Sequence, residues 1–118
     1  MSRHKQNAKL AIEIGAIDQI GTSLRVVQDA DLVILATPIN SIMEIALKIV
    51  KTLKKDCIVI DVGSTKEKIV SRLSALIPNF VGCHPLAGSE KKGILNAQGN
   101  IFAGSICIIT PIAKTRKN

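Results

Sequence analysis

The chain has 118 residues, 47% of them apolar, which suits one small domain with a real core. No apolar run approaches the roughly 20 residues that cross a bilayer, and the polar start lacks the apolar segment of a signal peptide. We therefore expect a soluble cytoplasmic protein.

Lys and Arg outnumber Asp and Glu by 16 to 9, which gives a net charge of +7. This excess indicates either a solvated basic surface or a site for a nucleotide phosphate. A nucleic-acid module is a more distant alternative, because the sequence has no Trp or Tyr and base stacking needs aromatic side chains. Strong, salt-dependent binding of DNA or RNA is the result expected of such a module.

The odd number of cysteines, without a secretory signal, predicts reduced thiols and no metal, because the spacing fits no zinc template. Cys57 and Cys107 stand in apolar runs and are expected to be small core residues. Cys83 directly precedes His84. In an extended segment such neighbours point to opposite faces, so we do not expect a catalytic Cys–His pair.

The first part of the chain predicts a helix over residues 7–14, with Gly15 as its natural end. A brief strand over residues 17–20 and a helical turn over residues 23–29 follow. Residues 31–36 form a continuous apolar run that is typical of a strand buried on both faces, and a Thr-Pro pair ends it.

The second part predicts two helices, each opened by a capping box in which Ser and Glu satisfy free amides. The boxes are Ser41–Glu44 and Ser64–Glu67, and apolar residues follow each at helical spacing. A strand over residues 57–62 is expected between the two helices, and strands over residues 79–82 and 105–109 are expected after them. A loop rich in Gly, Asn and Gln, over residues 91–104, precedes the last strand.

Alternating strands and helices indicate an α/β fold with right-handed crossovers and a parallel sheet. In such sheets ligands bind beyond the carboxyl ends of the strands. The segments at these ends are residues 36–38, 63–66 and 83–85. We expect them to meet at one edge and to form the site.

Five side chains near these ends could carry chemistry. His84 is suited to general base catalysis, or it simply ends a strand. Ser64 is expected to be a helix N-cap, at a helix start that could also hold an anion. Lys66 could reach a phosphate or carboxylate, although a solvated lysine is the commoner case. Asp61 could bond nearby backbone, and Glu90 is either a surface residue or a pocket residue beside His84.

Three segments together resemble the prephenate and arogenate dehydrogenase family: residues 30–38, residues 61–66 (Asp-Val-Gly-Ser-Thr-Lys) and residues 82–90 (Gly-Cys-His-Pro-Leu-Ala-Gly-Ser-Glu). The resemblance implies an incomplete Rossmann-like parallel sheet that lacks the first strand and the glycine-rich loop. No Gly-x-Gly occurs in the chain, although a dinucleotide fingerprint needs one. We expect a partial NAD(P)-binding domain over residues 1–111 and a polar tail or linker remnant over 112–118.

The family oxidises prephenate with NAD or NADP to 4-hydroxyphenylpyruvate, releasing carbon dioxide, in tyrosine biosynthesis. By resemblance, the catalytic residues are His84 and Ser64, and Ser89 and Glu90 join them around the substrate. The resemblance places the cofactor against Ser2, Arg3, Ala36, Thr37, Pro38 and Ser64. Arg3 falls where many members carry an acidic residue for the ribose, and an arginine there suits the 2′-phosphate of NADP.

Several alternatives remain beside this interpretation. Family members carry a further helical domain that forms homodimers, so the chain could be an inactive truncated fragment or a complementing partial subunit. It could also act on arogenate. A different β-hydroxyacid-type dehydrogenase would share the Ala-Thr-Pro strand end but not the segment at residues 84–90.

Overall fold

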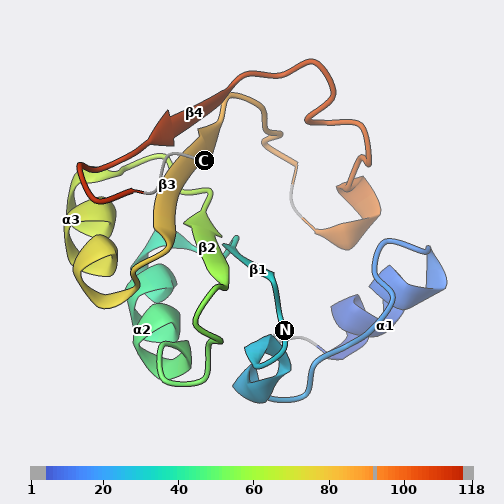
Figure 1. Ribbon diagram of the computed structural model, residues 1–118. Coiled ribbons are helices and arrows are strands. Elements are labelled where there is room, and N and C mark those ends of the chain that lie inside the picture. Colours follow the sequence, from blue (N-terminus) through green and yellow to red (C-terminus); the bar gives the residue numbers. More distant parts are fainter. Residues whose placement is uncertain (1–4, 92, 116–118) are drawn as a thin grey trace.

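The computed structural model describes residues 5–91 and 93–115 as an open sheet with helices beside it (Figure 1). The helical elements, in chain order, are α1 (Lys5–Glu13), η1 (Leu24–Val27), α2 (Ile39–Ile49), α3 (Glu67–Leu76) and η2 (Ile94–Asn96). The strands are β1 (Leu32–Leu35), β2 (Ile58–Asp61), β3 (Phe80–Pro85) and β4 (Cys107–Thr110). None of the helices in these two ranges is long and apolar enough to span a membrane.

The strands lie in the order β1-β2-β3-β4. β1 pairs with β2 and β2 with β3 in parallel, as the alternation of strands and helices predicts. β4 runs antiparallel to β3, which corrects the expectation of an entirely parallel sheet. A parallel return needs a long crossover, usually a helix. The connection from β3 to β4 instead carries only the short 3-10 helix η2.

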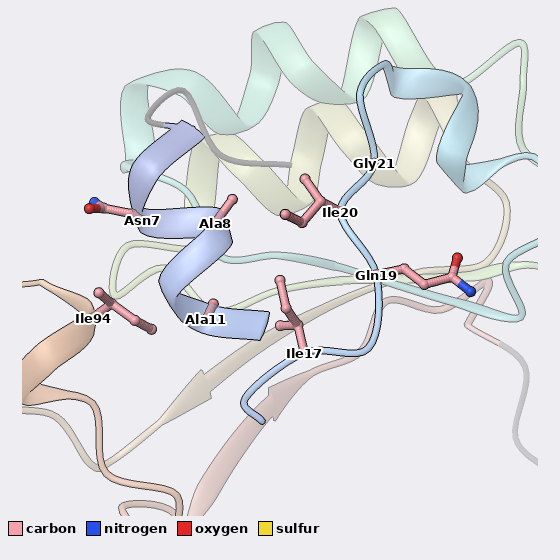
Figure 2. Close-up of a pocket in the computed structure, with 8 residues that line it drawn as sticks. All are labelled: Asn7, Ala8, Ala11, Ile17, Gln19, Ile20, Gly21 and Ile94. Carbon is pink, nitrogen blue, oxygen red and sulfur yellow. The ribbon is translucent and has the colours of Figure 1, made fainter. Parts of the chain in front are cut away.

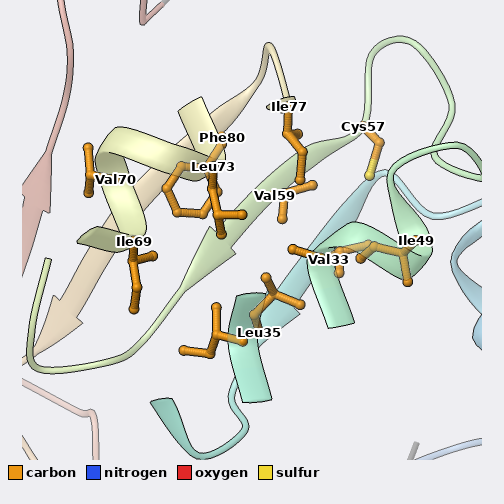
Figure 3. Packing of buried hydrophobic residues seen from close by; sticks show 12 residues of the cluster. Val33, Leu35, Ile49, Cys57, Val59, Ile69, Val70, Leu73, Ile77 and Phe80 are labelled. Carbon is orange, nitrogen blue, oxygen red and sulfur yellow. The ribbon is translucent and has the colours of Figure 1, made fainter. Parts of the chain in front are cut away.

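One face of the sheet is covered by α2 and α3, and the core lies between them and the strands (Figure 3). Each helix contributes apolar residues spaced by three or four positions, which therefore share one helix face. Leu73, Ile42 and Val59 have no exposed surface. The further core residues include Val33, Leu35, Ala46, Ile49, Cys57, Ile69, Val70, Ile77 and Phe80.

The opposite face of β1 and β2 carries apolar side chains that α2 and α3 do not cover. Leu32, Ile34 and Ile58 are 49%, 53% and 48% exposed. We call the side that these three residues define the bare face. The prediction of a strand buried on both faces is therefore wrong for β1, because both neighbouring helices pack on the same side.

The amino-terminal helix α1 lies away from the sheet, beside η2 (Figure 1). It ends at Glu13, and the turn that follows contains Gly15, the predicted stop, whose φ of 69° is easily reached only without a side chain. The predicted strand over residues 17–20 is not formed. A strand needs a neighbour for its backbone hydrogen bonds, and the only sheet in the described residues begins at β1.

Both predicted capping boxes are wrong. α2 begins at Ile39, directly after Pro38, and no side chain caps it. Proline is tolerated in this N-cap position because an N–H there would have no partner within the helix. α3 begins at Glu67 with Lys66 in the cap position, so Ser64 lies before the helix. The helical turn predicted over residues 23–29 is formed by η1, and the Ser23 hydroxyl caps it by accepting a hydrogen bond from the Arg25 amide.

Candidate functional site at the strand ends

Polar side chains with unused hydrogen-bonding capacity gather at the carboxyl ends of the three parallel strands. Thr37 Oγ1 follows β1, Asp61 Oδ1 ends β2 and His84 Nδ1 lies near the end of β3. All three atoms are buried and have no hydrogen-bond partner among the described residues. Buried polar atoms are normally paired. Three such atoms at one edge therefore mark the place where a bound ligand or water would satisfy them.

Asp61 is a fully buried carboxylate with two partners on one of its oxygens. Oδ2 accepts a hydrogen bond from the Gly63 amide at 2.9 Å and forms an ion pair with the Lys66 ammonium. The Lys66 side chain is itself only 14% exposed. The carboxylate therefore holds the chain on both sides of Ser64, between the end of β2 and the start of α3.

Gly82 provides the room for this ion pair. It lies opposite Asp61 in the register of β2 and β3. A Cβ atom at Gly82 would come within 2.6 Å of the Val70 side chain and 3.3 Å of Lys66 Cδ. Because such contacts are too close, only glycine lets α3 and Lys66 approach β3 at this point.

His84 lies on the same side of the sheet as Asp61. Gly82 pairs with Asp61, and His84 is two residues further along β3, so both project toward the covered face. Cys83 projects to the other side, which confirms that the two residues cannot form a catalytic pair. β3 runs to Pro85, beyond the predicted end at residue 82. The last residues of β3 pair with β4, and the sequence did not predict this pairing or its register.

The structure brings the predicted residues of the β1 and β2 ends to this edge. Ala36, Thr37 and Pro38 form the link from β1 to α2. Ser64 is exposed, and its hydroxyl makes no hydrogen bond among the described residues. Lys66 is neither a solvated lysine nor a free phosphate ligand, since it is committed to Asp61.

Ser89 and Glu90 lie on the exposed connection that leaves β3. The Ser89 hydroxyl accepts a hydrogen bond from the Lys91 amide at 3.1 Å, a local turn contact. The remaining two predicted cofactor residues, Ser2 and Arg3, lie outside the described residues. The structure therefore assembles the part of the site that is built on strand ends.

A separate hollow of about 300 Å³ lies between α1 and residues 17–21 (Figure 2). Ile17 and Ile20 face Ala8 and Ala11 across it, and Asn7 and Gln19 lie at its sides. It shares no lining residue with the strand-end cluster. Its walls are mostly apolar, and it contains none of the residues proposed for chemistry.

The pairing of Asp61 with Lys66 is the feature that sequence reasoning missed. A signal for it exists, because Asp61 is the single charged residue at the end of an apolar strand, and such a residue is rarely buried unless it is paired. Lys66 is the nearest following cation. The role of Gly82 has no signal in the sequence, since it depends on the approach of a helix from elsewhere in the chain.

Comparison with known proteins gives concordant results. Residues 1–118 match the family model described as "Prephenate dehydrogenase, nucleotide-binding domain". The prephenate dehydrogenase of Bacillus subtilis (strain 168) is 34% identical over an alignment of 117 residues, which covers 95% of this chain and 32% of that protein.

Two solved structures share the fold closely. Arogenate dehydrogenase from Synechocystis has a TM-score of 0.92 at 34% identity, over 98% of this chain and 42% of that chain. Prephenate dehydrogenase from A. aeolicus in complex with hydroxyphenyl propionate and NAD+ has a TM-score of 0.90 at 36% identity, over 98% of this chain and 41% of that chain. This chain therefore spans about a third of the curated relative and about two fifths of the solved ones.

Proposed function

This chain belongs to the prephenate dehydrogenase family, and we propose that it forms the cofactor-binding part of an NAD(P)-dependent oxidoreductase. The proposed reaction is oxidative decarboxylation of prephenate to 4-hydroxyphenylpyruvate. The observation that carries the proposal is His84, which lies near the end of β3 on the same side as Asp61. Its Nδ1 atom is buried and without a partner among the described residues.

Oxidation of the ring carbinol removes a hydride from carbon and a proton from the hydroxyl group. NAD(P), when bound, supplies the hydride acceptor. In the proposal, His84 accepts the hydroxyl proton, because a neutral imidazole can take up a proton near neutral pH. Loss of the ring carboxylate as carbon dioxide then completes the aromatic ring.

Ser64 and its loop complete the proposed centre. Its exposed hydroxyl has no internal partner, and Asp61 holds the backbone around it through Gly63 and Lys66. We propose that Ser64 contacts both substrate and cofactor, with residues 36–38 against the cofactor and Ser89 and Glu90 beside the substrate. The relative from A. aeolicus, solved with NAD+ and a hydroxyphenyl compound, supports a shared site for the two ligands.

For the cofactor we propose NADP over NAD, because the arginine at position 3 is always charged and suits a 2′-phosphate. Calorimetric titration with each dinucleotide, on a longer polypeptide that includes this chain and is as long as its relatives, compares the two directly. We expect tighter binding of NADP, and an Arg3→Ala variant should lose this preference. Tighter binding of NAD by the unaltered chain would contradict the proposal.

Arogenate is the second candidate substrate, favoured by the similarity to the Synechocystis arogenate dehydrogenase. Prephenate and arogenate differ in the side chain, but both have the ring hydroxyl group from which His84 is proposed to accept a proton. The ratio of kcat/KM for the two compounds therefore separates the candidates. An enzyme at least tenfold faster on arogenate would replace prephenate in the proposal.

We propose further that residues 1–118 alone are inactive and act as one part of a larger cytoplasmic enzyme or with a complementing chain. The sequence contains no Gly-x-Gly cradle for a pyrophosphate. Absorbance of reduced nicotinamide, recorded with prephenate and either dinucleotide, tests this directly. Turnover by the isolated chain at ordinary enzyme rates, on the order of 10 per second, would disprove it.

The decisive test of His84 uses a longer polypeptide that includes this chain and is as long as its relatives. His84→Asn removes the proton acceptor but keeps a similar size, so kcat should fall by roughly 10³-fold. The dissociation constant of the dinucleotide should change little. Lys91→Ala, at an exposed residue on the connection that follows β3, is the control. Unchanged kcat in His84→Asn would remove the basis of the proposed function.

A further inference from the structure

Cys83 and Cys107 are neighbours across the antiparallel strands β3 and β4. Cys83 pairs with Ile109 and Cys107 pairs with Pro85, so the two cysteines face the same side, one diagonal step apart. The Leu86 amide donates to the Ile106 carbonyl at 2.7 Å. Because hydrogen-bonded and non-hydrogen-bonded pairs alternate, both cysteines fall in non-hydrogen-bonded pairs, Cys83 opposite Ile109 and Cys107 opposite Pro85.

Pro85 explains why this arrangement is compatible with the sequence. Its ring nitrogen has no proton to donate, so a hydrogen-bonded position in the ladder would lose a bond. In a non-hydrogen-bonded pair with Cys107 nothing is lost. The register that puts Pro85 where no backbone hydrogen bond is lost is therefore also the one that makes the two thiols neighbours.

The two thiols differ in environment. Cys83 is 7% exposed, whereas Cys107 is exposed. The expectation that Cys107 is a core residue is therefore wrong. Burial is the main cause that raises the pKa of Cys83, and its contact with the Cys107 thiol raises it further. The third cysteine, Cys57, is buried at 2% in the core beneath α2 and provides an internal control.

We propose that Cys83 and Cys107 are an oxidisable pair that closes to a disulfide between β3 and β4 in the presence of a peroxide. The exposed Cys107 thiolate attacks one oxygen of hydrogen peroxide, giving a sulfenic acid and, with a proton, water. The sulfur of Cys83 then attacks the Cys107 sulfur and releases the second water. Two thiols are oxidised by two electrons while the peroxide is reduced to two waters.

Geometry makes this disulfide easy to reverse. Diagonal residues in an antiparallel pair lie about 7–8 Å apart at Cα, whereas a relaxed disulfide needs about 4.4–6.8 Å. Closing the bond therefore draws the two strands together, and strained disulfides are the ones that thiol reductants open readily. The crosslink would also lie next to His84, which stands between Cys83 and Pro85, the residue opposite Cys107.

Intact-mass measurement on the reduced chain, treated with hydrogen peroxide at low protein concentration, tests the proposal. We expect the loss of two hydrogens per chain, reversed by a thiol reductant. Trypsin cleaves at Lys91 between the two cysteines, so non-reduced peptide mapping identifies the crosslink directly in the unaltered protein. Oxidation should be faster at alkaline pH, because the raised pKa of Cys83 limits its thiolate.

Variants separate this pair from other thiol chemistry. Cys83→Ser and Cys107→Ser should each prevent the crosslink, whereas Cys57→Ser should form it as the unaltered chain does. A map in which Cys107 is only over-oxidised or linked between chains, with Cys83 still reduced, would overturn the proposal. So would a crosslink that includes Cys57. Neither result depends on dehydrogenase activity, so the pair can fail while the proposed function stands.

Discussion

The two faces of the sheet carry similar side chains in opposite surroundings. Val33 and Val59 on the covered face are 8% and 0% exposed, while Leu32, Ile34 and Ile58 on the bare face are about half exposed. These residues alternate along the same two strands. The difference comes entirely from α2 and α3, which both pack on one side. An apolar strand sequence thus allows either face to be buried, and the packing of the helices determines which face is.

The two lysine–aspartate pairs at opposite ends of the strands repeat this contrast. At the carboxyl ends, the Asp61 side chain has no exposed surface and the Lys66 side chain, at the start of α3, is 14% exposed. Asp31 and Lys54 form a 2.6 Å pair at the amino ends, where both side chains are well exposed. The same chemistry should therefore contribute to stability at one end far more than at the other. The following variants, from the largest expected effect to the smallest, test this difference.

Leu73→Ala should have the largest effect. Leu73 has no exposed surface and packs between α3 and the sheet, so the substitution leaves a cavity and costs about 4 kcal/mol of unfolding free energy. Urea denaturation followed by circular dichroism measures it. A loss below about 1 kcal/mol would show that the covered face is not a packed core.

Asp61→Ala should cost about 3 kcal/mol, because it leaves the largely buried Lys66 ammonium without its partner. The double variant Asp61→Leu with Lys66→Met removes both charges and should recover most of the loss. The same urea measurement on the unaltered chain, on Asp61→Leu, on Lys66→Met and on the double variant completes a double-mutant cycle and gives the coupling energy. Equal losses in the single and double variants would mean that the charge pairing contributes nothing.

Asp31→Asn should have a smaller effect that depends on pH. The hydrogen bond and charge of Lys54 lower the pKa of Asp31 below its ordinary 3.8 in the folded chain. The ionised pair therefore contributes stability above about pH 4, and this contribution is lost as the pH falls through the lowered pKa. Denaturation at pH 7 and pH 3 should show a larger difference from the unaltered chain at pH 7 than at pH 3.

Ile34→Thr on the bare face should change the unfolding free energy least, by no more than about 0.5 kcal/mol. Ile34 is 53% exposed, so little apolar burial is lost, and threonine keeps the β-branched shape that strands favour. Val33→Thr, one residue earlier on the covered face, is the matched control and should cost clearly more. Equal losses at the two positions would mean that the bare face is buried in solution.

Much of the fold follows from local pattern. The apolar runs at β1 and β2 predict strands because β-branched residues suit an extended chain. Helical spacing identifies the buried faces of α2 and α3. Gly15 predicts the end of α1 because only glycine reaches its backbone conformation without cost. The helix starts were wrong because Pro38 and the Asp61–Lys66 pair override the capping preference of the nearby serines.

The candidate site was predictable in part for the same reason. Parallel strands must present their carboxyl ends at one edge, so the grouping of Thr37, Ser64 and His84 follows from strand order alone. The commitment of Lys66 to Asp61 did not follow, because it needs the gap that Gly82 leaves opposite Asp61. The proximity of Cys83 and Cys107 was not predictable either, because it depends on the register in which β4 pairs with β3.

By itself the sequence determined the kinds of element, their order, and the edge where His84, Ser64 and Thr37 meet, because these depend on residues near one another in the chain. Only the tertiary structure decided which face of β1 is buried and which way β4 runs. It also decided where Asp61 finds its counter-charge and that Cys83 faces Cys107. Each of these depends on a contact between segments distant in sequence, and local preferences carry no record of such contacts.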